Sequence, residues 1–472
     1  MKTKNLIAVL SAVIVFAVLM LLPAPAGMEV KTWNMVAVVA LISILWITEA
    51  IHLSVTALLP IILLPLLGIT PASKVTLSYA NDAIYLFLGG FILALAVERS
   101  NVHKRFALYT VRMVGTTPSL VILGFMMAVF FISMWMSNTT TVLIVVPICF
   151  AIINQFPEAH RHKQLPFQKA LLLGIAYAAT IGGLSTLVGT PPNIICASII
   201  SKTTGIDVSF MQWMAFALPV SLVLLFLSWI LLTRVLFRVN RVELPFTRDF
   251  IVSELATLGK MTPHEKRILI VFTSVACLWL FHGLIPIPAL KDSITDTSIA
   301  IAGAVSLFLI PDGTKKGSML ITWEEAKKLP WGILILFGGG LALSDGFNNS
   351  GLTSYLAHEF ELLKSLNLWL ILLIAISFAV FLSEIMSNTA CAALLVPIVL
   401  TVASVFGVSP LMLAIPVTLA TSTAFMLPVG TPPNAIVYSY NVLTIKDMVR
   451  AGFMLDLISI GLLLVASALF LR

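Results

Sequence analysis

Two short polar motifs, each present twice, interrupt apolar stretches of the chain and contain the residues best suited to binding. Ser-Asn-Thr occurs at 137–139 and at 387–389, and Gly-Thr-Pro-Pro-Asn occurs at 189–193 and at 430–434. Serine, asparagine and threonine compete for backbone hydrogen bonds, and proline removes a donor, so both motifs predict breaks in helices. The free N–H groups of such a break could bind an anion, and its free carbonyls could coordinate a cation.

The sequence around these motifs is duplicated as well. Residues 132–148 and 382–398 are identical at eight of 17 positions, at an offset of 250. The same offset aligns Phe87 with Phe337, and the second motif recurs at an offset of 241. Exposed backbone is tolerated in a bilayer only where it lines a protein-enclosed cavity. Paired breaks in two halves therefore indicate the binding site of a secondary transporter.

Hydroxyl, amide and glycine carbonyl oxygens near each break form a neutral set that suits a small hard cation such as sodium. This set is Ser133, Ser137, Asn138 and Gly189 in the first half, and Ser383, Ser387, Asn388 and Gly430 in the second. No Lys or Arg occurs at 113–160 or at 365–445. The charge of an anionic ligand must therefore be met by hydroxyl and amide donors, by cations and by helix N-termini. Two N-termini, at roughly half a charge each, would offset about one charge of a dianion.

Composition places these breaks in a membrane protein. Hydrophobic residues make up 59% of the 472 residues and charged residues only 10%, whereas soluble globular proteins carry about 25% charged residues. This composition excludes a soluble enzyme, a nucleic-acid-binding protein and a disordered chain. Because one span needs roughly 20 apolar residues, the sequence predicts an all-α polytopic membrane protein with about 11 transmembrane helices.

Charge and the terminal segment predict the orientation. The most polar stretch, 234–267, contains seven basic residues and is expected on the cytoplasmic side. The apolar run at 6–22 resembles a signal peptide but is longer than a usual signal core, so we predict a first transmembrane helix with a cytoplasmic N-terminus in the plasma membrane. The four cysteines lie in apolar runs without metal-ligand spacing and are expected to be buried.

The segment WITEAIHLSVTALLP at 46–60, both Ser-Asn-Thr motifs and both Gly-Thr-Pro-Pro-Asn motifs together resemble the divalent anion/sodium symporter family, the INDY-type di- and tricarboxylate transporters. The resemblance runs from about residue 34 to the C-terminus. It implies an inverted-repeat homodimer with a scaffold domain and an elevator-type transport domain, and with two re-entrant hairpins at 83–108 and 331–357. The implied division is scaffold helices at 1–82, a first-repeat transport segment at 83–201, scaffold helices with the polar linker at 202–330, and a second-repeat transport segment at 331–472.

The resemblance also assigns ligands to residues of this chain. It implies substrate contacts from Ser137, Asn138, Thr139, Thr190, Pro191, Ser387, Asn388, Thr389, Thr431 and Pro432. It implies one sodium site at Ser133, Ser137, Asn138 and Gly189. It implies a second at Ser383, Asn388, Gly430 and the Met386 carbonyl. No organic cofactor is expected.

The sequence therefore predicts a secondary active transporter of small dicarboxylates, of the succinate, malate, fumarate or 2-oxoglutarate type, coupled to sodium. Sodium-independent dicarboxylate exchange is the main alternative, and citrate or sulfate transport and an anion channel stay open. An intramembrane enzyme would need a nucleophile with a base, or a metal pair, which the motifs do not supply. Glu384 is the only charged residue at 365–445 and is expected to form a structural hydrogen bond or to take part in coupling. Trp135 is expected to pack.

Overall fold

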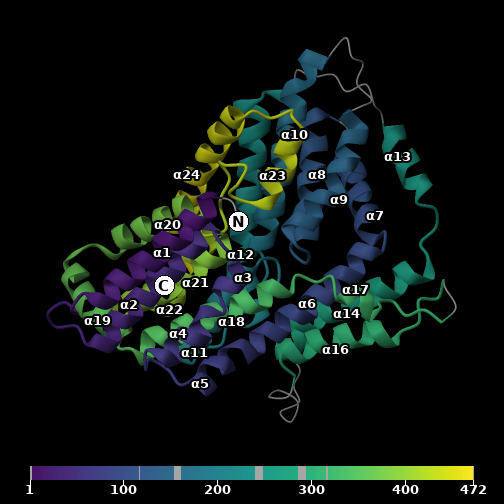
Figure 1. The fold of residues 1–472 in the computed structure, drawn as a ribbon. Coiled ribbons are helices and arrows are strands. Elements are labelled where there is room, and N and C mark those ends of the chain that lie inside the picture. The colour runs from purple at the N-terminus through teal and green to yellow at the C-terminus, as the bar shows by residue number, and fades with distance from the viewer. Residues whose placement is uncertain are drawn as a thin grey trace.

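The computed structural model is helical throughout the residues that it describes (Figure 1). These residues are 3–115, 117–153, 161–239, 248–284, 294–314 and 317–470. Within these ranges the only extended pairing is an isolated bridge between Pro311 and Met319. The predicted all-α class is therefore confirmed.

The helices follow one another with short connections. The N-terminal part contains α1 (Thr3–Leu21), α2 (Val30–Thr48), α3 (Leu53–Thr56), α4 (Leu59–Leu66), α5 (Ala72–Leu77), η1 (Ser78–Ala80), α6 (Asp82–Arg99) and α7 (Val102–Val114). The next part contains α8 (Pro118–Ser133), α9 (Asn138–Ile153), α10 (Arg161–Leu184), α11 (Pro191–Thr204) and α12 (Phe210–Ile230). The central part contains α13 (Arg248–Thr257), α14 (Pro263–Phe281), α16 (Asp296–Leu309), α17 (Trp323–Ala326), α18 (Trp331–Asn349) and α19 (Leu352–Glu361). The C-terminal part contains α20 (Leu368–Ser383), α21 (Asn388–Phe406), α22 (Pro410–Ala420), α23 (Pro432–Ser439) and α24 (Ile445–Phe470).

Several of the long helices begin at a capping box. In this motif the N-cap side chain accepts a hydrogen bond from the backbone N–H of the third residue after it. The side chain of that third residue accepts a hydrogen bond from the backbone N–H of the N-cap. Such pairs start α12, α14 and α16, and they are Ser209 with Gln212, Thr262 with Glu265, and Thr295 with Ser298. These bonds satisfy N–H groups that have no partner within the helix, so polar residues fix where each apolar run begins.

Seven helical segments of the described chain are long and apolar enough to cross a membrane. They are Lys4–Leu21, Val30–Thr48, Ala72–Arg99, Gln164–Leu184, Phe210–Leu236, Asn388–Phe406 and Ile445–Leu469. Further apolar helices are shorter, and these include α8, α9, α20 and α22. Seven is fewer than the expected count of about 11, because these other apolar helices are shorter than a full span.

The chain reverses direction at the first Ser-Asn-Thr motif. Met126 of α8 lies against Gly174 of α10, and Asn138, the first residue of α9, lies against Gly183 near the end of α10. α8 and α10 therefore run in the same direction. If α9 continued that direction, its end would lie more than about 50 Å from the start of α10. The seven residues between α9 and α10 reach at most about 28 Å, so α9 must run back along α10. α8 and α9 thus form a helical hairpin with the motif at its tip.

The second Ser-Asn-Thr motif has an equivalent setting. α20 and α21 contact each other and both pack against α22, with only residues 407–409 between α21 and α22. The hairpins expected at 83–108 and 331–357 lie elsewhere, since the reversals occur at 134–137 and 384–387. The stretch 83–108 instead forms most of α6 and the first half of α7. The polar motifs, expected to lie at breaks in helices, lie in the turns of these two hairpins.

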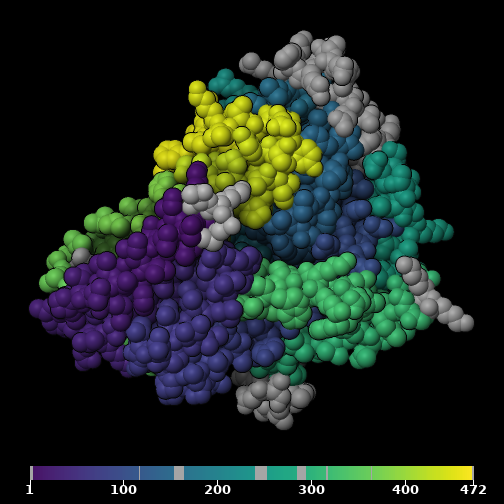
Figure 2. All heavy atoms as spheres, in the orientation of Figure 1, coloured from purple at the N-terminus to yellow at the C-terminus, as the bar shows by residue number. Residues whose placement is uncertain are grey.

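The two repeats pack reciprocally against each other. α10 of the first repeat contacts α23 of the second, and α22 of the second contacts α11 of the first. Phe87 and its repeat equivalent Phe337 contact each other directly, with ring centroids 5.7 Å apart. A residue that touches its own equivalent lies near an approximate two-fold axis. Figure 2 shows the result on the surface, where the C-terminal residues (yellow) lie directly against residues of the first repeat (blue).

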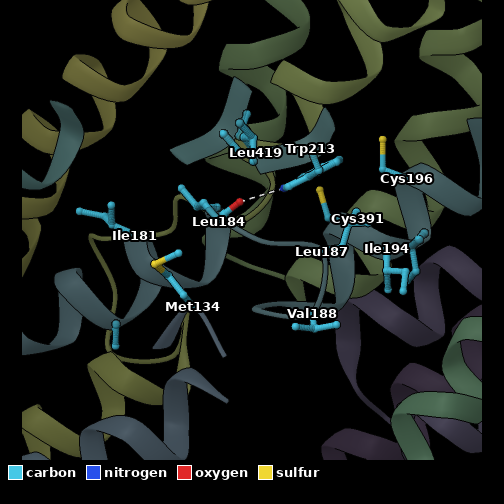
Figure 3. Packing of buried hydrophobic residues seen from close by; sticks show 14 of the residues in the cluster. Met134, Ile181, Leu184, Leu187, Val188, Ile194, Cys196, Trp213, Cys391 and Leu419 are labelled. Carbon is cyan, nitrogen blue, oxygen red and sulfur yellow. Dashed lines mark hydrogen bonds between the residues drawn. The ribbon is translucent and has the colours of Figure 1, made fainter. Parts of the chain in front are cut away.

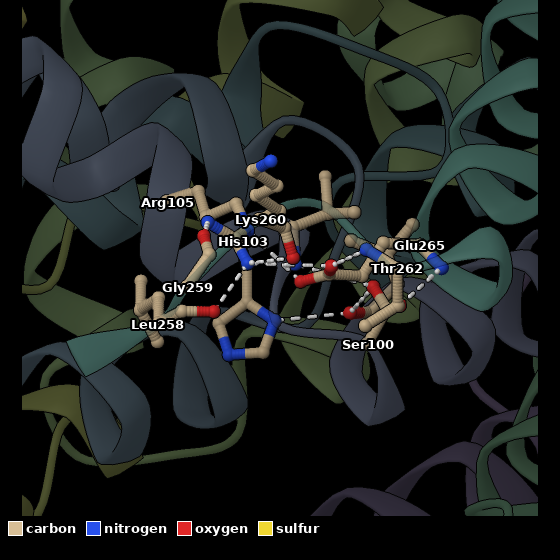
Figure 4. A network of polar contacts seen from close by, with 10 residues as sticks. Ser100, His103, Arg105, Leu258, Gly259, Lys260, Thr262 and Glu265 are labelled. Atoms are coloured by element: carbon tan, nitrogen blue, oxygen red, sulfur yellow. Dashed lines mark hydrogen bonds and ion pairs between the residues drawn. The ribbon is translucent and has the colours of Figure 1, made fainter. Parts of the chain in front are cut away.

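A buried ion pair anchors α7 to the polar segment that precedes α14. The Arg105 guanidinium donates to the Glu265 carboxylate at 3.0 Å and to the carbonyls of Leu258 and Gly259 at 2.6 and 2.7 Å (Figure 4). Burial opposes ionisation of Glu265, but the bonds from Arg105 and Thr262 outweigh it and lower the pKa of this carboxyl below its usual value. The pair therefore ties the predicted cytoplasmic linker to the helical body.

We expect Arg105→Ala to destabilise the protein by about 3 kcal/mol or more, because Glu265 would become a buried charge without its partner. Lys104→Ala is the matched control, since the neighbouring Lys104 side chain is exposed, and it should change stability by less than about 0.5 kcal/mol. Thermal unfolding of the purified protein in detergent compares the two variants. Equal Tm values for both variants would contradict this anchoring role.

Candidate functional site

Each repeated motif lies at the N-terminal end of a helix. The two Ser-Asn-Thr motifs start α9 and α21, and the two Gly-Thr-Pro-Pro motifs start α11 and α23. Thr190 and Thr431 are the N-caps of α11 and α23, and proline follows each of them at the first helical position. Proline is favoured there because its missing N–H would have no partner within the helix anyway. Thr431 Oγ1 accepts the Asn434 N–H at the start of α23, and helix starts in general leave further N–H groups that a ligand can bind.

The four helix starts form two pairs, and each pair takes one helix from each repeat. α9 packs against α23, and their C-terminal ends meet where Phe150 stacks on Tyr440 with ring centroids 4.2 Å apart. α11 packs against α21, and their C-terminal halves line one pocket of about 260 Å³ through Thr203 and Thr401. The two helices of each pair therefore run in the same direction. Their N-termini lie at a common end, which concentrates positive dipole ends at the motifs.

Three oxygens converge at the first hairpin tip. The buried Ser133 Oγ lies 2.7 Å from Asn138 Oδ1 and 2.8 Å from the Ala179 carbonyl oxygen. The hydroxyl carries one proton and can donate to only one of these oxygens at a time. A small cation would satisfy the remaining lone pairs. The structure thus brings Ser133 and Asn138 together as expected and adds the Ala179 carbonyl, which the sequence did not indicate.

Two glycines allow the backbone to approach this cluster closely. A Cβ on Gly183 would lie 2.5 Å from Asn138 Oδ1, which is closer than real Cβ atoms come to other heavy atoms. A Cβ on Gly189 would lie 2.5 Å from the Gly183 carbonyl oxygen. The contacts run in sequence from the Gly189 motif through Gly183 to Asn138. They connect the first broken helix to the first hairpin tip, and neither glycine can carry a side chain without displacing its neighbour.

The second half of the site is built differently. Ser383 Oγ donates to the Val380 carbonyl of its own helix at 2.7 Å rather than to Asn388. Asn388 Oδ1 is buried and has no hydrogen-bond partner. Gly430 packs against the Glu384 carboxylate, since a Cβ there would lie 3.0 Å from Oε2. The expected Ser383 and Asn388 pair is therefore not formed as it is in the first half, and the amide oxygen is left for a ligand.

Two asparagines at the ends of the Gly-Thr-Pro-Pro-Asn motifs brace the unwound segments and were missed as site residues. Asn193 Nδ2 donates to the carbonyls of Gly183 at 2.9 Å and Thr186 at 2.7 Å. Its equivalent Asn434 donates to the carbonyls of Ala424 at 3.3 Å and Leu427 at 3.1 Å. The Oδ1 atoms of both asparagines are buried without a partner. Their occurrence in both copies of the motif was the signal that could have identified them.

The other expected residues differ in exposure. Ser137 is exposed at the hairpin tip, Thr139, Ser387 and Thr389 are half-buried, and Met386 is buried. Pro191 is half-buried and Pro432 is exposed. In the part of the chain that the structure describes, no hydrogen bond joins the two Ser-Asn-Thr motifs directly. The contact between the repeats here is that of α11, which starts at the first Gly-Thr-Pro-Pro-Asn motif, with α21, which starts at the second Ser-Asn-Thr motif.

Aromatic and apolar packing fixes the first hairpin tip and the segment beside it. Trp135 is stacked on Phe210 and on Trp279 of α14, with centroids 5.8 and 6.2 Å away, so it packs as expected. Trp213 Nε1 donates to the Leu184 carbonyl at 3.1 Å and caps the end of α10 (Figure 3). Leu187 belongs to the same buried cluster. The break is therefore a fixed feature of the packed interior.

Within the described ranges, no group of three His, Cys, Asp or Glu side chains could hold a metal ion. Lys169 and Lys202 are paired with Asp447 and Asp345. The cysteines are free, and three are buried as expected, whereas Cys277 lies on the outer surface of α14. A ligand of this site would meet mainly neutral oxygens, amides and helix N-termini.

We expect Gly183→Ala to reduce transport by at least about tenfold, because the added methyl group would displace the Asn138 side chain. Gly461→Ala is the matched control, since no atom lies within 4 Å of the added Cβ. Uptake by equal amounts of purified protein in proteoliposomes compares them. Normal uptake by the Gly183 variant would show that this Asn138 geometry is not required.

Comparison with known proteins agrees with this architecture. The family described as "Sodium:sulfate symporter transmembrane region" matches residues 3–472. Two curated relatives are "Sodium-dependent dicarboxylate transporter SdcS" of Staphylococcus saprophyticus, 42% identical over 97% of this chain and 89% of that protein, and of Staphylococcus aureus, 41% identical over the same shares. The crystal structure of the Alcanivorax borkumensis YdaH transporter has a similar fold, with a TM-score of 0.55 and 14% identity over 84% of this chain and 86% of that one. The chain belongs to the sodium:sulfate symporter family of multi-pass membrane proteins.

Proposed function

We propose that this protein is a sodium-coupled secondary transporter of small dicarboxylates, of the succinate, malate, fumarate or 2-oxoglutarate type, in the plasma membrane. The observation that carries the proposal is the meeting of four helix N-termini with partnerless amide oxygens in a region without a free cationic side chain. The names of the curated relatives, which are sodium-dependent dicarboxylate transporters, support the substrate class and the coupling ion.

The charges of the site suit a dianion together with sodium. An ionised carboxylate loses hydration worth many kcal/mol when it leaves water. Four helix N-termini at about half a charge each offset roughly two negative charges, which is twice the contribution expected when only two starts are counted. These helix starts belong to the unit proposed to move, so their dipoles travel with the substrate, but the dipoles are weakened wherever the site is hydrated. Co-bound sodium would neutralise the loaded carrier during the crossing.

The proposed ligands follow the two halves of the site. The first sodium ion would be held by Ser133, Ser137, Asn138 and Gly189, with the Ala179 carbonyl as a further oxygen. The second would be held by Ser383, Met386, Asn388 and Gly430. The substrate carboxylates would bind the hairpin tips and the N-caps through Ser137, Asn138, Thr139, Thr190, Pro191, Ser387, Asn388, Thr389, Thr431 and Pro432.

We infer an elevator movement in a homodimer. The moving unit would comprise α8–α12 and α20–α24, and the scaffold would comprise α1–α6, α14, α16 and α18. α6 packs mainly against α16, so we place it in the scaffold. α18 packs against η1, α3 and α4 on one side and against α21 and α11 on the other, so we place it in the scaffold at the interface with the moving unit. The boundaries then fall near 118 and 368 instead of 83 and 331. The N-terminus and the linker at 234–267 would face the cytoplasm.

We expect proteoliposomes containing the purified protein to accumulate succinate when an inward sodium gradient is imposed, and to lose most of this uptake when choline replaces sodium. Ser133→Ala should weaken the dependence on sodium, because it removes one of the three converging oxygens. The measurement is the initial rate of labelled succinate uptake across sodium concentrations. Full-rate counterflow of dicarboxylate in choline would contradict sodium coupling and would favour the exchanger.

The interface between the two proposed units offers a test of the movement. Lys202 of α11 pairs with Asp345 of α18, and Ser78 of η1 lies 3.1 Å from the Lys202 ammonium. In the double variant Lys202→Cys/Asp345→Cys, a short bifunctional methanethiosulfonate can bridge the two cysteines. We expect this bridge to stop uptake and a reducing agent to restore it. The linked helices could no longer move past each other.

The matched control bridges the Lys169 and Asp447 positions, which pair at 2.7 Å between α10 and α24 inside the proposed moving unit. Both variants would carry Cys277→Ser, because Cys277 is the exposed native thiol among the described cysteines. The control bridge should leave uptake unchanged. Uptake that survives bridging of the Lys202 and Asp345 positions would contradict rigid movement of the two units.

A further inference from the structure

A buried acidic side chain in the second repeat holds the unwound segment between α22 and α23. Glu384 is only 2% exposed and lies in the turn of the second hairpin. Its Oε1 accepts the Met426 N–H at 2.7 Å, and its Oε2 accepts the Leu427 N–H at 2.9 Å. One carboxylate thereby satisfies two successive backbone donors that an unwound segment would otherwise leave free.

The first repeat has a bond at the same two positions, but its direction is reversed. Met134 is the repeat equivalent of Glu384, and Thr186 is the repeat equivalent of Leu427. Thr186 Oγ1 donates to the Met134 carbonyl at 2.5 Å. In the first repeat the polar side chain therefore comes from the unwound segment, and in the second repeat it comes from the hairpin. Both bonds tie a hairpin tip to the broken helix of its own repeat.

We propose that Glu384 is a positioning residue, which holds the segment carrying Gly430 and Thr431 against the second hairpin tip and thereby sets the geometry of the second cation site. The inference deepens the proposed function and rests on it for the role of the cation. Glu384 needs no contact with substrate in this role, since it acts through the two backbone N–H groups.

The bond of the second repeat should hold more firmly than that of the first. Glu384 accepts two backbone N–H groups, whereas Thr186 makes a single bond in the first repeat. The carboxylate also packs against Gly430, because a Cβ there would lie 3.0 Å from Oε2. In the first repeat the single bond from Thr186 is enough to hold the unwound segment, because Ser133, Asn138 and the Ala179 carbonyl already converge there. In the second repeat Asn388 Oδ1 has no partner, and Glu384 is the hairpin side chain that holds the unwound segment, beside the bonds from Asn434.

Two other helices fix the start of the same segment. Tyr177 OH of α10 donates to the Phe425 carbonyl at 3.2 Å, and their rings meet edge to face with centroids 5.0 Å apart. Asp456 of α24 lies close to Phe425 and to Glu384. Loss of Glu384 should therefore loosen the stretch from Met426 to Gly430 at its N–H groups without releasing Phe425, while Asn434 still holds the Leu427 carbonyl.

The chain offers a matched pair of variants for the test. Glu384→Met removes the carboxylate and reproduces the residue of the first repeat. Glu384→Met combined with Leu427→Thr also reproduces the donor of the first repeat, so the tie should re-form as a hydroxyl-to-carbonyl bond. Glu384→Gln keeps one acceptor and most of the volume, which provides a milder variant if the methionine variant folds poorly.

We expect Glu384→Met to raise the sodium concentration for half-maximal dicarboxylate uptake by about tenfold, with a smaller change in the rate at saturating sodium. The double variant should recover most of the sodium affinity, and Glu384→Gln should fall between wild type and Glu384→Met. A merely structural role would lower Tm and the active fraction and leave the sodium half-saturation unchanged. An unchanged half-saturation in Glu384→Met, or no recovery in the double variant, would overturn the proposal.

Hydrogen exchange tests the positioning role of Glu384 independently of transport. The amides of Met426 and Leu427 should exchange much more slowly in the wild type than in Glu384→Met, as measured by mass spectrometry on peptides covering 421–431. Equal exchange rates in the two proteins would overturn the proposal, regardless of which substrate the wild-type protein transports. Slower exchange in the wild type would support the positioning role even if sodium-coupled dicarboxylate uptake were absent and the proposed function failed.

Discussion

The central constraint on this molecule is the cost of bringing a charged ligand out of water and into the middle of a helical membrane protein. An isolated ionic group buried in an apolar medium is strongly unfavourable, and it must be met by opposite charge or by directed dipoles. The chain meets this need mainly with backbone. Four helices begin at the two pairs of motifs, and their free N–H groups form the positive part of the site. The hairpins, the proline-rich N-termini and the close glycine contacts all serve to bring these helix starts together.

Duplication supplies two such sets of helix starts, but the two halves are not copies in detail. In the first half, Ser133 and Asn138 are already in contact, and a threonine hydroxyl ties the unwound segment to the hairpin. In the second half, Asn388 Oδ1 is free and a carboxylate forms the equivalent tie. The same backbone arrangement is therefore stabilised by different side chains. In the proposed transporter, this asymmetry would let the two halves differ in their affinity for a cation.

The sequence predicted the all-α membrane class and the helix starts at the duplicated motifs, because composition and motifs can be read from short stretches of chain. Glycine and proline in Gly189–Asn193 indicated a break directly, and the structure has a helix start there. The reversal at Ser137 was not predicted, since a polar tripeptide in an apolar run is compatible with a kinked helix or with a hairpin tip. The Ala179 carbonyl could not be predicted at all, because a backbone oxygen has no side-chain signature. Glu384 was recognised as unusual, but its partners at Met426 and Leu427 depend on packing between distant helices.

The central claim is that sodium and helix N-termini, rather than a cationic side chain, neutralise the bound dianion. Equilibrium binding of labelled succinate to the purified protein, measured across sodium concentrations at constant ionic strength with choline, tests this claim without transport. Linkage requires that co-bound ions tighten substrate binding, so we expect log Kd to fall with log sodium concentration at a slope of about two over the range where the sites fill. The same Kd at every sodium concentration would contradict it.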